Sequence, residues 1–337
     1  MRRETLLIEL DPAQPDREAV DRAAESLRKG GLVAFPTETV YGLGADALDP
    51  QAVRKIFVAK GRPLDNPVIV HVAGPEDLAV ITDDVPSEAT LLMKQFWPGP
   101  LTLIFRKSRR VPEVVTGGQD TVAVRMPRNA IALALVRALG HPIAAPSANL
   151  SGRPSPTTAR HVLDDLGGRI DIILDGGPVE VGLESTVLDL SRHPPALLRP
   201  GAVTREDLKP FVGEVAAGTA PALLKRSPGT RYRHYSPRAR VTLVEEADQE
   251  TMDRLAASYA GRGRKVGLLT HHPCSLQGDA DVVVRSMPRD LKAYARQMFA
   301  VMRELDELGV DEMIIEGVEE AGMGAAIMDR LRRAASR

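Results

Sequence analysis

The stretch LVAFPTETVYGLGADALDPQAVRKIFVAKGRPLDNPVIVHV, residues 32–72, decides the fold class of this chain. Its opening, LVAFPTET, predicts a buried strand that runs into a polar loop. DPQAVRKIFVAKG then predicts a helix that ends at Gly61, and NPVIVHV predicts another strand. The same alternation of strand and helix patterns continues to about residue 210, which is typical of the α/β class.

A change of composition separates this region from a second one. Residues 213–240 are rich in Gly, Pro and Ser and show no period, which predicts a linker. From Val241 onward the strand and helix patterns return with short loops. They indicate a small, parallel, doubly wound domain. We therefore expect a first domain at 1–212, a linker at 213–239 and a second domain at 240–337.

The composition excludes several classes of protein. Hydrophobic residues make up 43% and charged residues 26%, as in globular proteins with sizeable cores. The 44 Lys and Arg against 45 Asp and Glu give a net charge of -1, which argues against non-specific coating of nucleic acid. Because Cys274 is the single cysteine, neither a disulfide framework nor a cysteine-based zinc site is expected.

The apolar runs are short throughout the chain. The first residues contain too short an apolar stretch for a signal peptide, and no run approaches the ~20 residues of a membrane span. We therefore expect a cytoplasmic protein that does not enter a membrane.

Three polar segments could hold a ligand. Residues 35–46, FPTETVYGLGAD, place small hydroxyl residues beside glycines, which permits close backbone approach. Residues 59–67, AKGRPLDNP, set Lys60 and Arg62 on a stiff loop that suits an oligophosphate. Residues 145–159, APSANLSGRPSPTTA, bring hydroxyls and amides to the end of a strand, a setting typical of nucleotide-binding edges.

Each segment also has a structural interpretation. Residues 35–46 could be an ordinary turn at a strand end. Lys60 and Arg62 could complement the dipole of the preceding helix. Residues 145–159 could be a polar loop that caps the next helix. The residue pattern alone leaves these alternatives open.

Three single residues have the same ambiguity. Arg125 ends the strand TVAVR and Arg199 precedes Pro200, so either arginine could be a solvated charge. His71 lies inside PVIVHV, where a core histidine with satisfied hydrogen bonds is the ordinary interpretation.

The linker contains a basic cluster. Between Lys225 and Arg240 there are six Lys or Arg and no acid, with Tyr232, His234 and Tyr235 interleaved. It could be a solvated hinge, an arm that contacts RNA, or a lid with phosphate-binding cations. Several common motifs are absent from the sequence. It lacks GxxxxGK[ST], so a P-loop is not expected, and it lacks HExxH. GMGAA at 322–326 lacks the full dinucleotide fingerprint.

Taken in order, several segments match a known family. FPTETVYGLGADA, KGRPLDNPVIVHV, WPGPLT, VAVRMP, APSANLSGRPSPT, ESTVLDL and LLRPGAV resemble the YrdC-like domain of threonylcarbamoyl-AMP synthases over residues 10–205. The linker SPGTRYRHYSP and the ending EGVEEAGMGAAIMDRLRRAA resemble the long form of that family. The resemblance implies a twisted α/β sheet with helices around a deep cavity, followed by a smaller Rossmann-like C-terminal domain.

The resemblance also implies an activity. L-Threonine and bicarbonate would combine to a carbamate that attacks the α-phosphorus of ATP, which releases pyrophosphate and leaves L-threonylcarbamoyl-AMP. A separate transferase complex would then modify the adenosine beside the tRNA anticodon, and the chain itself could contact tRNA. Mg²⁺ is expected with ATP, held mainly by phosphates and water. Such chemistry needs positioning and fixed cations more than a nucleophilic side chain.

The same resemblance implies two sets of site residues. Threonine would be surrounded by Thr39, His71, Arg125, the backbone at Ala145, and Ser185. ATP would be contacted by Lys60, Arg62, Asn66, Thr121, Ser147, Asn149, Ser155, Arg199 and Tyr235. Lys60 and Arg62 would be the catalytic cations, Arg125 would pair with the threonine carboxylate, and Tyr235 would close over the nucleotide.

Three other functions compete with this one. The chain could be a non-catalytic RNA-binding protein, or a nucleotide-binding regulator whose C-terminal domain is the sensor. It could also be a carbamoyl-handling maturation enzyme, because YrdC-like domains occur there too. The absence of zinc-finger cysteines and of an acylphosphatase-like segment argues against the last of these.

Overall fold

The computed structural model describes residues 4–218, 220–229, 234–246, 248–272, 276 and 281–336. The chain divides into two compact units, Met1–Ser151 with Ser155–Arg231, and Gly152–Pro154 with Tyr232–Arg337. This division falls inside the expected linker at 213–239, and the expected domain boundaries stay a prediction. Cys274 and the linker residues 231–233 lie outside the described residues. Within the described ranges, no helix combines the length and apolarity needed to cross a bilayer.

The first unit is built on a mixed sheet, for which the described part of the chain supplies 11 strands in the order β1-β8-β2-β3-β7-β4-β6-β5-β9-β10-β11. The strands are β1 (Leu6–Glu9), β2 (Val33–Phe35), β3 (Gly42–Asp46), β4 (Ile69–His71), β5 (Leu101–Arg106), β6 (Thr121–Arg125), β7 (Ile143–Ala144), β8 (Ile172–Asp175), β9 (Thr186–Asp189), β10 (Ala196–Arg199) and β11 (Ala216–Ala217). The helices are α1 (Arg17–Arg28), α2 (Pro50–Lys60), the 3₁₀-helix η1 (Pro75–Val80), α3 (Ser87–Phe96), α4 (Glu113–Thr116), α5 (Ala130–Leu139), α6 (Ala159–Leu166), α7 (Arg205–Val212) and α8 (Pro221–Leu224).

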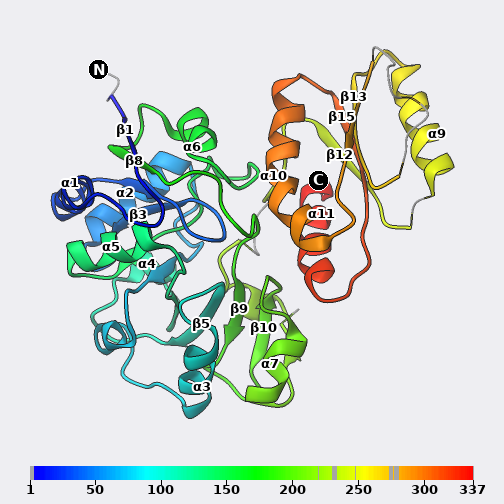
Figure 1. Cartoon of the computed structure of the whole chain (residues 1–337). Helices are drawn as coiled ribbons and strands as arrows, with labels where there is room; N and C mark the ends of the chain where they lie inside the picture. Colours follow the sequence, from blue (N-terminus) through cyan, green and yellow to red (C-terminus); the bar gives the residue numbers. More distant parts are fainter. Residues whose placement is uncertain are drawn as a thin grey trace. The chain divides into compact units, whose positions relative to one another are not determined.

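The helices follow the sequence signals closely. Asp16 caps α1 by accepting from Ala19 N, and the apolar stripe of α1 is buried. Helices α1 and α5 lie side by side, and Figure 1 shows them together. Helix α2 is capped by Asp49 and ends at Gly61, whose φ of 63° is the left-handed conformation that favours glycine. This ending sets Lys60 on the last turn and Arg62 in the loop.

Strand β3 was not predicted. The sequence indicated a buried strand, LVAFPTET, that runs into a polar loop, and it indicated no strand after that loop, but Gly42–Asp46 pairs antiparallel with β2. Glycine has low strand propensity, which hides the signal. At Gly44 an added Cβ would lie 2.8 Å from both the Phe35 ring and Ile143, so close packing requires glycine there.

The central strands separate two apolar cores. Val70, Val122 and Val124 belong to the large core of the unit. Ile69 and Ala123, their neighbours on the same strands, belong to a smaller cluster. Because side chains alternate along a strand, the residues two positions from Ile69 and Ala123 share the face of this smaller cluster.

The second unit confirms the predicted parallel, doubly wound arrangement. Its four described strands run parallel in the order β12-β15-β13-β14. Figure 1 shows α9 on one side of this sheet and α10 with α11 on the other. The elements are β12 (Arg240–Val244), α9 (Gln249–Ala260), β13 (Val266–Thr270), β14 (Val282–Ser286), α10 (Leu291–Glu307), β15 (Glu312–Glu316) and α11 (Met323–Ala335).

Candidate active site

Polar side chains from several strands share one face of the first unit's sheet. His71 pairs in register with Arg125, two residues beyond the Ile69–Ala123 pair. Paired residues point to the same side of a sheet, so both lie on the face of the smaller apolar cluster. Ser185 reaches the same face, because its Oγ is hydrogen-bonded to Thr102, which lies on β5 two positions from Ile104 of that cluster.

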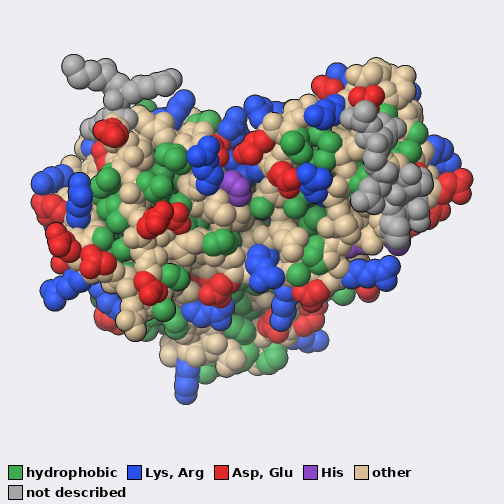
Figure 2. Space-filling view, turned by 45° about the horizontal axis from the view of Figure 1, so that its top comes forward, with side chains coloured by type: hydrophobic (Ala, Val, Ile, Leu, Met, Phe, Trp, Pro, Cys, Tyr) green, Lys and Arg blue, Asp and Glu red, His purple; other side chains and the backbone are tan. Residues whose placement is uncertain are grey.

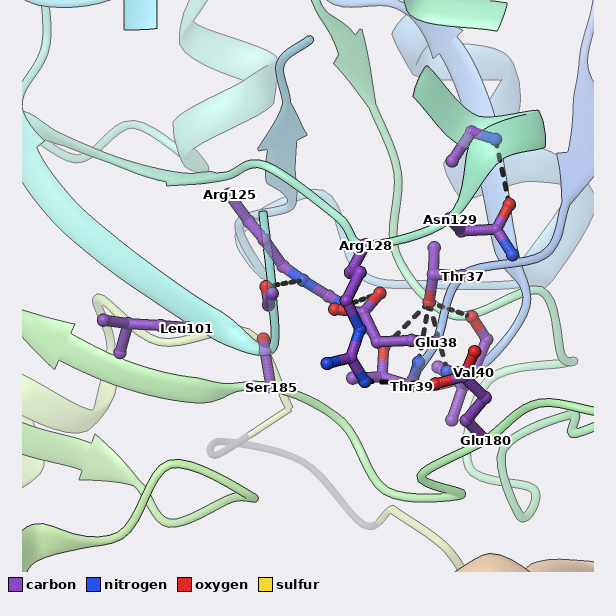
Figure 3. Close-up of polar contacts among 12 residues, drawn as sticks. Thr37, Glu38, Thr39, Val40, Leu101, Arg125, Arg128, Asn129, Glu180 and Ser185 are labelled. Carbon is purple, nitrogen blue, oxygen red and sulfur yellow. Dashed lines mark hydrogen bonds and ion pairs between the residues drawn. The ribbon is translucent and has the colours of Figure 1, made fainter. Parts of the chain in front are cut away.

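Arg125 is the centre of the first group of contacts. Its Nε donates to Gly99 O at 3.1 Å and its Nη1 donates to Thr39 Oγ1 at 2.8 Å. Its Nη2 lies 2.6 Å from Glu38 Oε2, and both side chains of this ion pair are buried. Figure 3 shows Thr39 and Glu38 turned toward the guanidinium. Two residues predicted for threonine, Thr39 and Arg125, are therefore in direct contact.

Ser185 links this region to Arg199. Arg199 donates to Ser185 O at 3.0 Å through Nε and to Ser185 Oγ at 3.1 Å through Nη2. Ser185 Oγ also shares a hydrogen bond of 2.7 Å with Thr102 Oγ1. A residue predicted for threonine and one predicted for ATP therefore meet through two hydrogen bonds.

Lys60 forms a second group with Ser147 and Asn149. Its buried ammonium donates to Ser147 O at 2.6 Å and to Asn149 O. Ser147 Oγ donates to Asn149 Oδ1 at 2.5 Å. Lys60 therefore reaches from the end of α2 to the loop after β7, and these contacts go beyond the helix-dipole interpretation.

The remaining predicted ATP residues form smaller groups. Arg62 donates to Asn66 O at 3.3 Å and to Pro67 O at 2.8 Å. The Asn66 side chain is fully buried, and neither of its amide atoms has a hydrogen-bond partner in the part of the chain that the structure describes. A buried amide without partners, such as that of Asn66, is costly, and it suits a contact with a ligand. Ser155 donates to Glu184, the residue before Ser185.

Strand β6 fixes the distance between one residue of each predicted set. Thr121 and Arg125 are the two ends of β6. Four residue steps of a strand separate them by roughly 13 Å. Asn66 precedes β4 at the same end as Thr121, because β4 and β6 are parallel. Ala145 donates its backbone N–H to Ile69 O at 2.8 Å, which holds its backbone beside β4.

His71 is neutral in this environment. Burial, and then the positive charge of Arg125, lowers the pKa of His71 from 6.5 to about 3. Its ring meets Phe35 edge-on at 5.9 Å, and its Nδ1 has no hydrogen-bond partner among the described residues. A neutral imidazole can donate or accept a hydrogen bond but cannot balance a charge.

This shift of the His71 pKa predicts a pH-dependent stability. In the unfolded chain His71 binds a proton below about pH 6.5. In the folded chain the His71 imidazole stays neutral down to about pH 3. Stability is therefore lost as the pH falls. From pH 7 to pH 5 the wild type should lose about 2 kcal/mol of unfolding free energy more than His71→Gln. Urea denaturation of both proteins at the two pH values measures the difference, and equal losses would contradict it.

Tyr235 belongs to the second unit, where it is buried. Its ring stacks on Phe299 at 5.4 Å, and the Arg330 guanidinium lies 5.6 Å from the ring centroid. Its φ of 61° is in the left-handed region, which is uncommon for an aromatic residue. Its predicted contact with a nucleotide stays a prediction.

Sequence reasoning gave no role to two acidic residues of this region. Glu38 pairs with Arg125, and Glu184 accepts from Ser155. Glu38 stands between two threonines, and this carboxylate in a hydroxyl-rich motif was the available signal. Figure 2 shows Lys and Arg interspersed with Asp and Glu over the face drawn, in keeping with the net charge of -1.

Comparisons with known proteins cover both units. The Sua5/YciO/YrdC family model, described as "Telomere recombination", matches residues 25–201. A second model, "Threonylcarbamoyl-AMP synthase, C-terminal domain", matches residues 203–336. The chain is 50% identical over 321 residues to a threonylcarbamoyl-AMP synthase of Pyrococcus abyssi, which covers 93% of this chain and 92% of the relative. A Bacillus subtilis threonylcarbamoyl-AMP synthase is 47% identical, with 94% of this chain and 92% of the relative covered.

Solved structures agree with these matches. The crystal structure of P. abyssi Sua5 complexed with L-threonine superposes with a TM-score of 0.92 and 46% identity, over 98% of each chain. E. coli YciO superposes with a TM-score of 0.56 and 30% identity, and covers 61% of this chain and 99% of its own.

Proposed function

The chain belongs to the Sua5/YciO/YrdC family and has the C-terminal domain of threonylcarbamoyl-AMP synthases, and from this premise we propose that it is an L-threonylcarbamoyladenylate synthase. It converts L-threonine, bicarbonate and ATP to L-threonylcarbamoyl-AMP, pyrophosphate and the water that is released when the amine and bicarbonate form the carbamate. The relative complexed with L-threonine supports the amino-acid substrate.

One observation supports the proposal above the others. Ser185, predicted for threonine, binds both the Nη2 and the Nε of Arg199, predicted for ATP. On the same sheet face, Arg125 contacts Thr39. An enzyme that joins an amino-acid carbamate to a nucleotide needs the two binding regions to meet, so that the reacting atoms are held together.

The proposed division of roles follows from the side chains. Arg125 offers a planar fork for the threonine carboxylate. Lys60 and Arg62 are fixed cations for the charge that develops on the α-phosphate and the leaving pyrophosphate. Both are buried, and a cation in a buried setting acts more strongly than it would in water.

The carbamate is the nucleophile in this reaction. Its oxygen attacks the α-phosphorus, the bond to the β-phosphate oxygen breaks, and pyrophosphate leaves with the electron pair. The protein's part is to position the two substrates and to stabilise charge. The hydroxyls, amides, lysine and arginines of the site suit that task.

We propose that Mg²⁺ accompanies ATP, where it neutralises charge on the phosphates. No group of three or more His, Cys, Asp or Glu side chains in the described ranges is placed to hold a metal ion. Phosphate oxygens and water would therefore supply most of its ligands, which is the usual way in which Mg²⁺ binds with a nucleotide.

Pyrophosphate release tests the proposed function. We expect release from ATP to require both L-threonine and bicarbonate, because the nucleophile forms from these two substrates. The measurement is pyrophosphate production with each substrate omitted in turn, together with mass detection of the adenylate. Pyrophosphate release that persists without threonine would contradict the proposed function.

The remaining partners are also proposals. The product would pass to a separate transferase complex that modifies the adenosine next to the tRNA anticodon. We propose that the enzyme is cytoplasmic. Direct contact with tRNA through the basic cluster at 225–240 stays a prediction, because residues 231–233 lie outside the described residues.

A further inference from the structure

Glu38 occupies an unusual position for a carboxylate. Its side chain has no exposure to solvent, and the Arg125 side chain is only 4% exposed. Apart from the 2.6 Å ion pair with Arg125 Nη2, neither Glu38 oxygen has a hydrogen-bond partner among the described residues. An ionised carboxylate can accept about four hydrogen bonds. Most of the accepting capacity of Glu38 is therefore unused.

The backbone around Glu38 is held in place. Thr37 Oγ1 accepts from Thr39 N and Val40 N, each at 3.2 Å, and donates to Val40 O at 2.6 Å. The Glu38 carbonyl accepts from Val181 N at 2.8 Å, and the Thr39 carbonyl accepts from Gly182 N at 3.0 Å. Figure 3 shows this turn beside Arg125. The position of the carboxylate follows from a fixed turn.

The ion pair alone does not account for this arrangement. A buried ion pair contributes little net stability, because removing two charges from water offsets most of their attraction. An unpartnered buried oxygen adds a further cost. Native proteins retain buried charged groups with unused hydrogen-bonding capacity mainly where a ligand or a reaction interacts with them.

The proposed substrate has the complementary groups. L-Threonine has an ammonium and a carboxylate on one carbon atom, so its recognition needs an anion and a cation side by side. Arg125 is assigned to the carboxylate. The ammonium has three donors, and the backbone carbonyl at Ala145 could accept one of them but has no charge to offset. Glu38 lies next to Arg125 and has both the charge and the free acceptors.

Resting on the proposed function, we propose that Glu38 binds the ammonium group of L-threonine and forms, with Arg125, a pair that recognises the zwitterionic amino acid. The site then selects ligands with a free α-amino group. A ligand that lacks this group leaves the Glu38 carboxylate without its donors, which disfavours binding.

The test compares two ligands in two proteins without ATP. L-Threonine and 3-hydroxybutanoate, an analogue that lacks only the α-amino group, are titrated calorimetrically into wild type and Glu38→Gln. We expect Glu38→Gln to lower the affinity for L-threonine at least about thirtyfold, because one partner of a buried charge pair becomes neutral. Binding of the analogue should change less than about threefold, since it has no ammonium to lose. Glu180→Gln is the control, because Glu180 pairs at the surface with Arg128 close to the same turn.

Other outcomes overturn the proposal. If Glu38→Gln binds both ligands more tightly, Glu38 only competes with the substrate carboxylate for Arg125. If both ligands weaken equally, Glu38 only supports Arg125. If Glu38→Gln does not fold, the wild type still decides, because equal affinities for L-threonine and the analogue would exclude an acidic partner for the ammonium. Failure of the wild type to bind L-threonine would instead count against the proposed function.

Discussion

Replacing Lys60 with methionine is expected to lower kcat/KM for ATP by about a thousandfold, the effect of removing one fixed donor from a buried transition-state site. Methionine keeps the length and apolar stem of the side chain but removes the ammonium. That ammonium also donates to the backbone carbonyls of Ser147 and Asn149. The loop after β7 should therefore become less ordered, at a cost of about 1–3 kcal/mol in unfolding free energy.

Lys55→Met provides the matched control for this change. Lys55 lies on the same helix and also donates to a backbone carbonyl, Gly30 O at 2.5 Å, away from the predicted site. Pyrophosphate release is measured against ATP concentration at saturating threonine and bicarbonate, and both variants are denatured in urea. If the two variants keep equal kcat/KM, the task of Lys60 is confined to holding the 147–149 loop.

Replacing Arg125 with methionine is expected to lower the unfolding free energy by about 3–5 kcal/mol, because Glu38 becomes a buried charge without its partner. The same variant should raise the KM for L-threonine about a hundredfold or more, since it loses the fork assigned to the carboxylate. The KM for ATP should change much less.

The double variant Arg125→Met/Glu38→Leu separates these two effects. Replacing both charges by apolar side chains removes the unpaired carboxylate, so stability should return to within about 2 kcal/mol of the wild type. Threonine use should not return. A double variant that is as unstable as Arg125→Met would show that the loss comes from the contacts of Arg125 with Thr39 and Gly99.

The sequence was informative where local chemistry decides the structure. Asp49, Pro50 and Gly61 mark the limits of α2, and the apolar runs around Val70 and Val124 mark buried strands. These signals act over a few residues and can be identified without a structure. The glycines of β3 conceal a strand. Close packing requires them, although glycine has a low propensity for strands.

The contacts of the site could not be predicted in this way. Arg125 and Thr39 are 86 positions apart, and Lys60 and Ser147 are 87 apart. Both contacts depend on strand order and register, which composition and periodicity do not specify. The resemblance supplied the residues, and the sheet explains why Arg125 and His71 lie together. The pairing of Glu38 with Arg125 appears only in three dimensions.

The length of strand β6 sets the distance between Thr121 and Arg125. A loop can gain or lose a residue and adjust, whereas a strand that keeps its regular pairing has a fixed spacing along the chain. One inserted residue between Thr121 and Arg125 would turn one of them to the opposite face. Two inserted residues would keep both on one face but lengthen the span by about 7 Å. The loops predicted to contact the nucleotide can therefore vary in length, while this strand holds the distance between Thr121 and Arg125 constant.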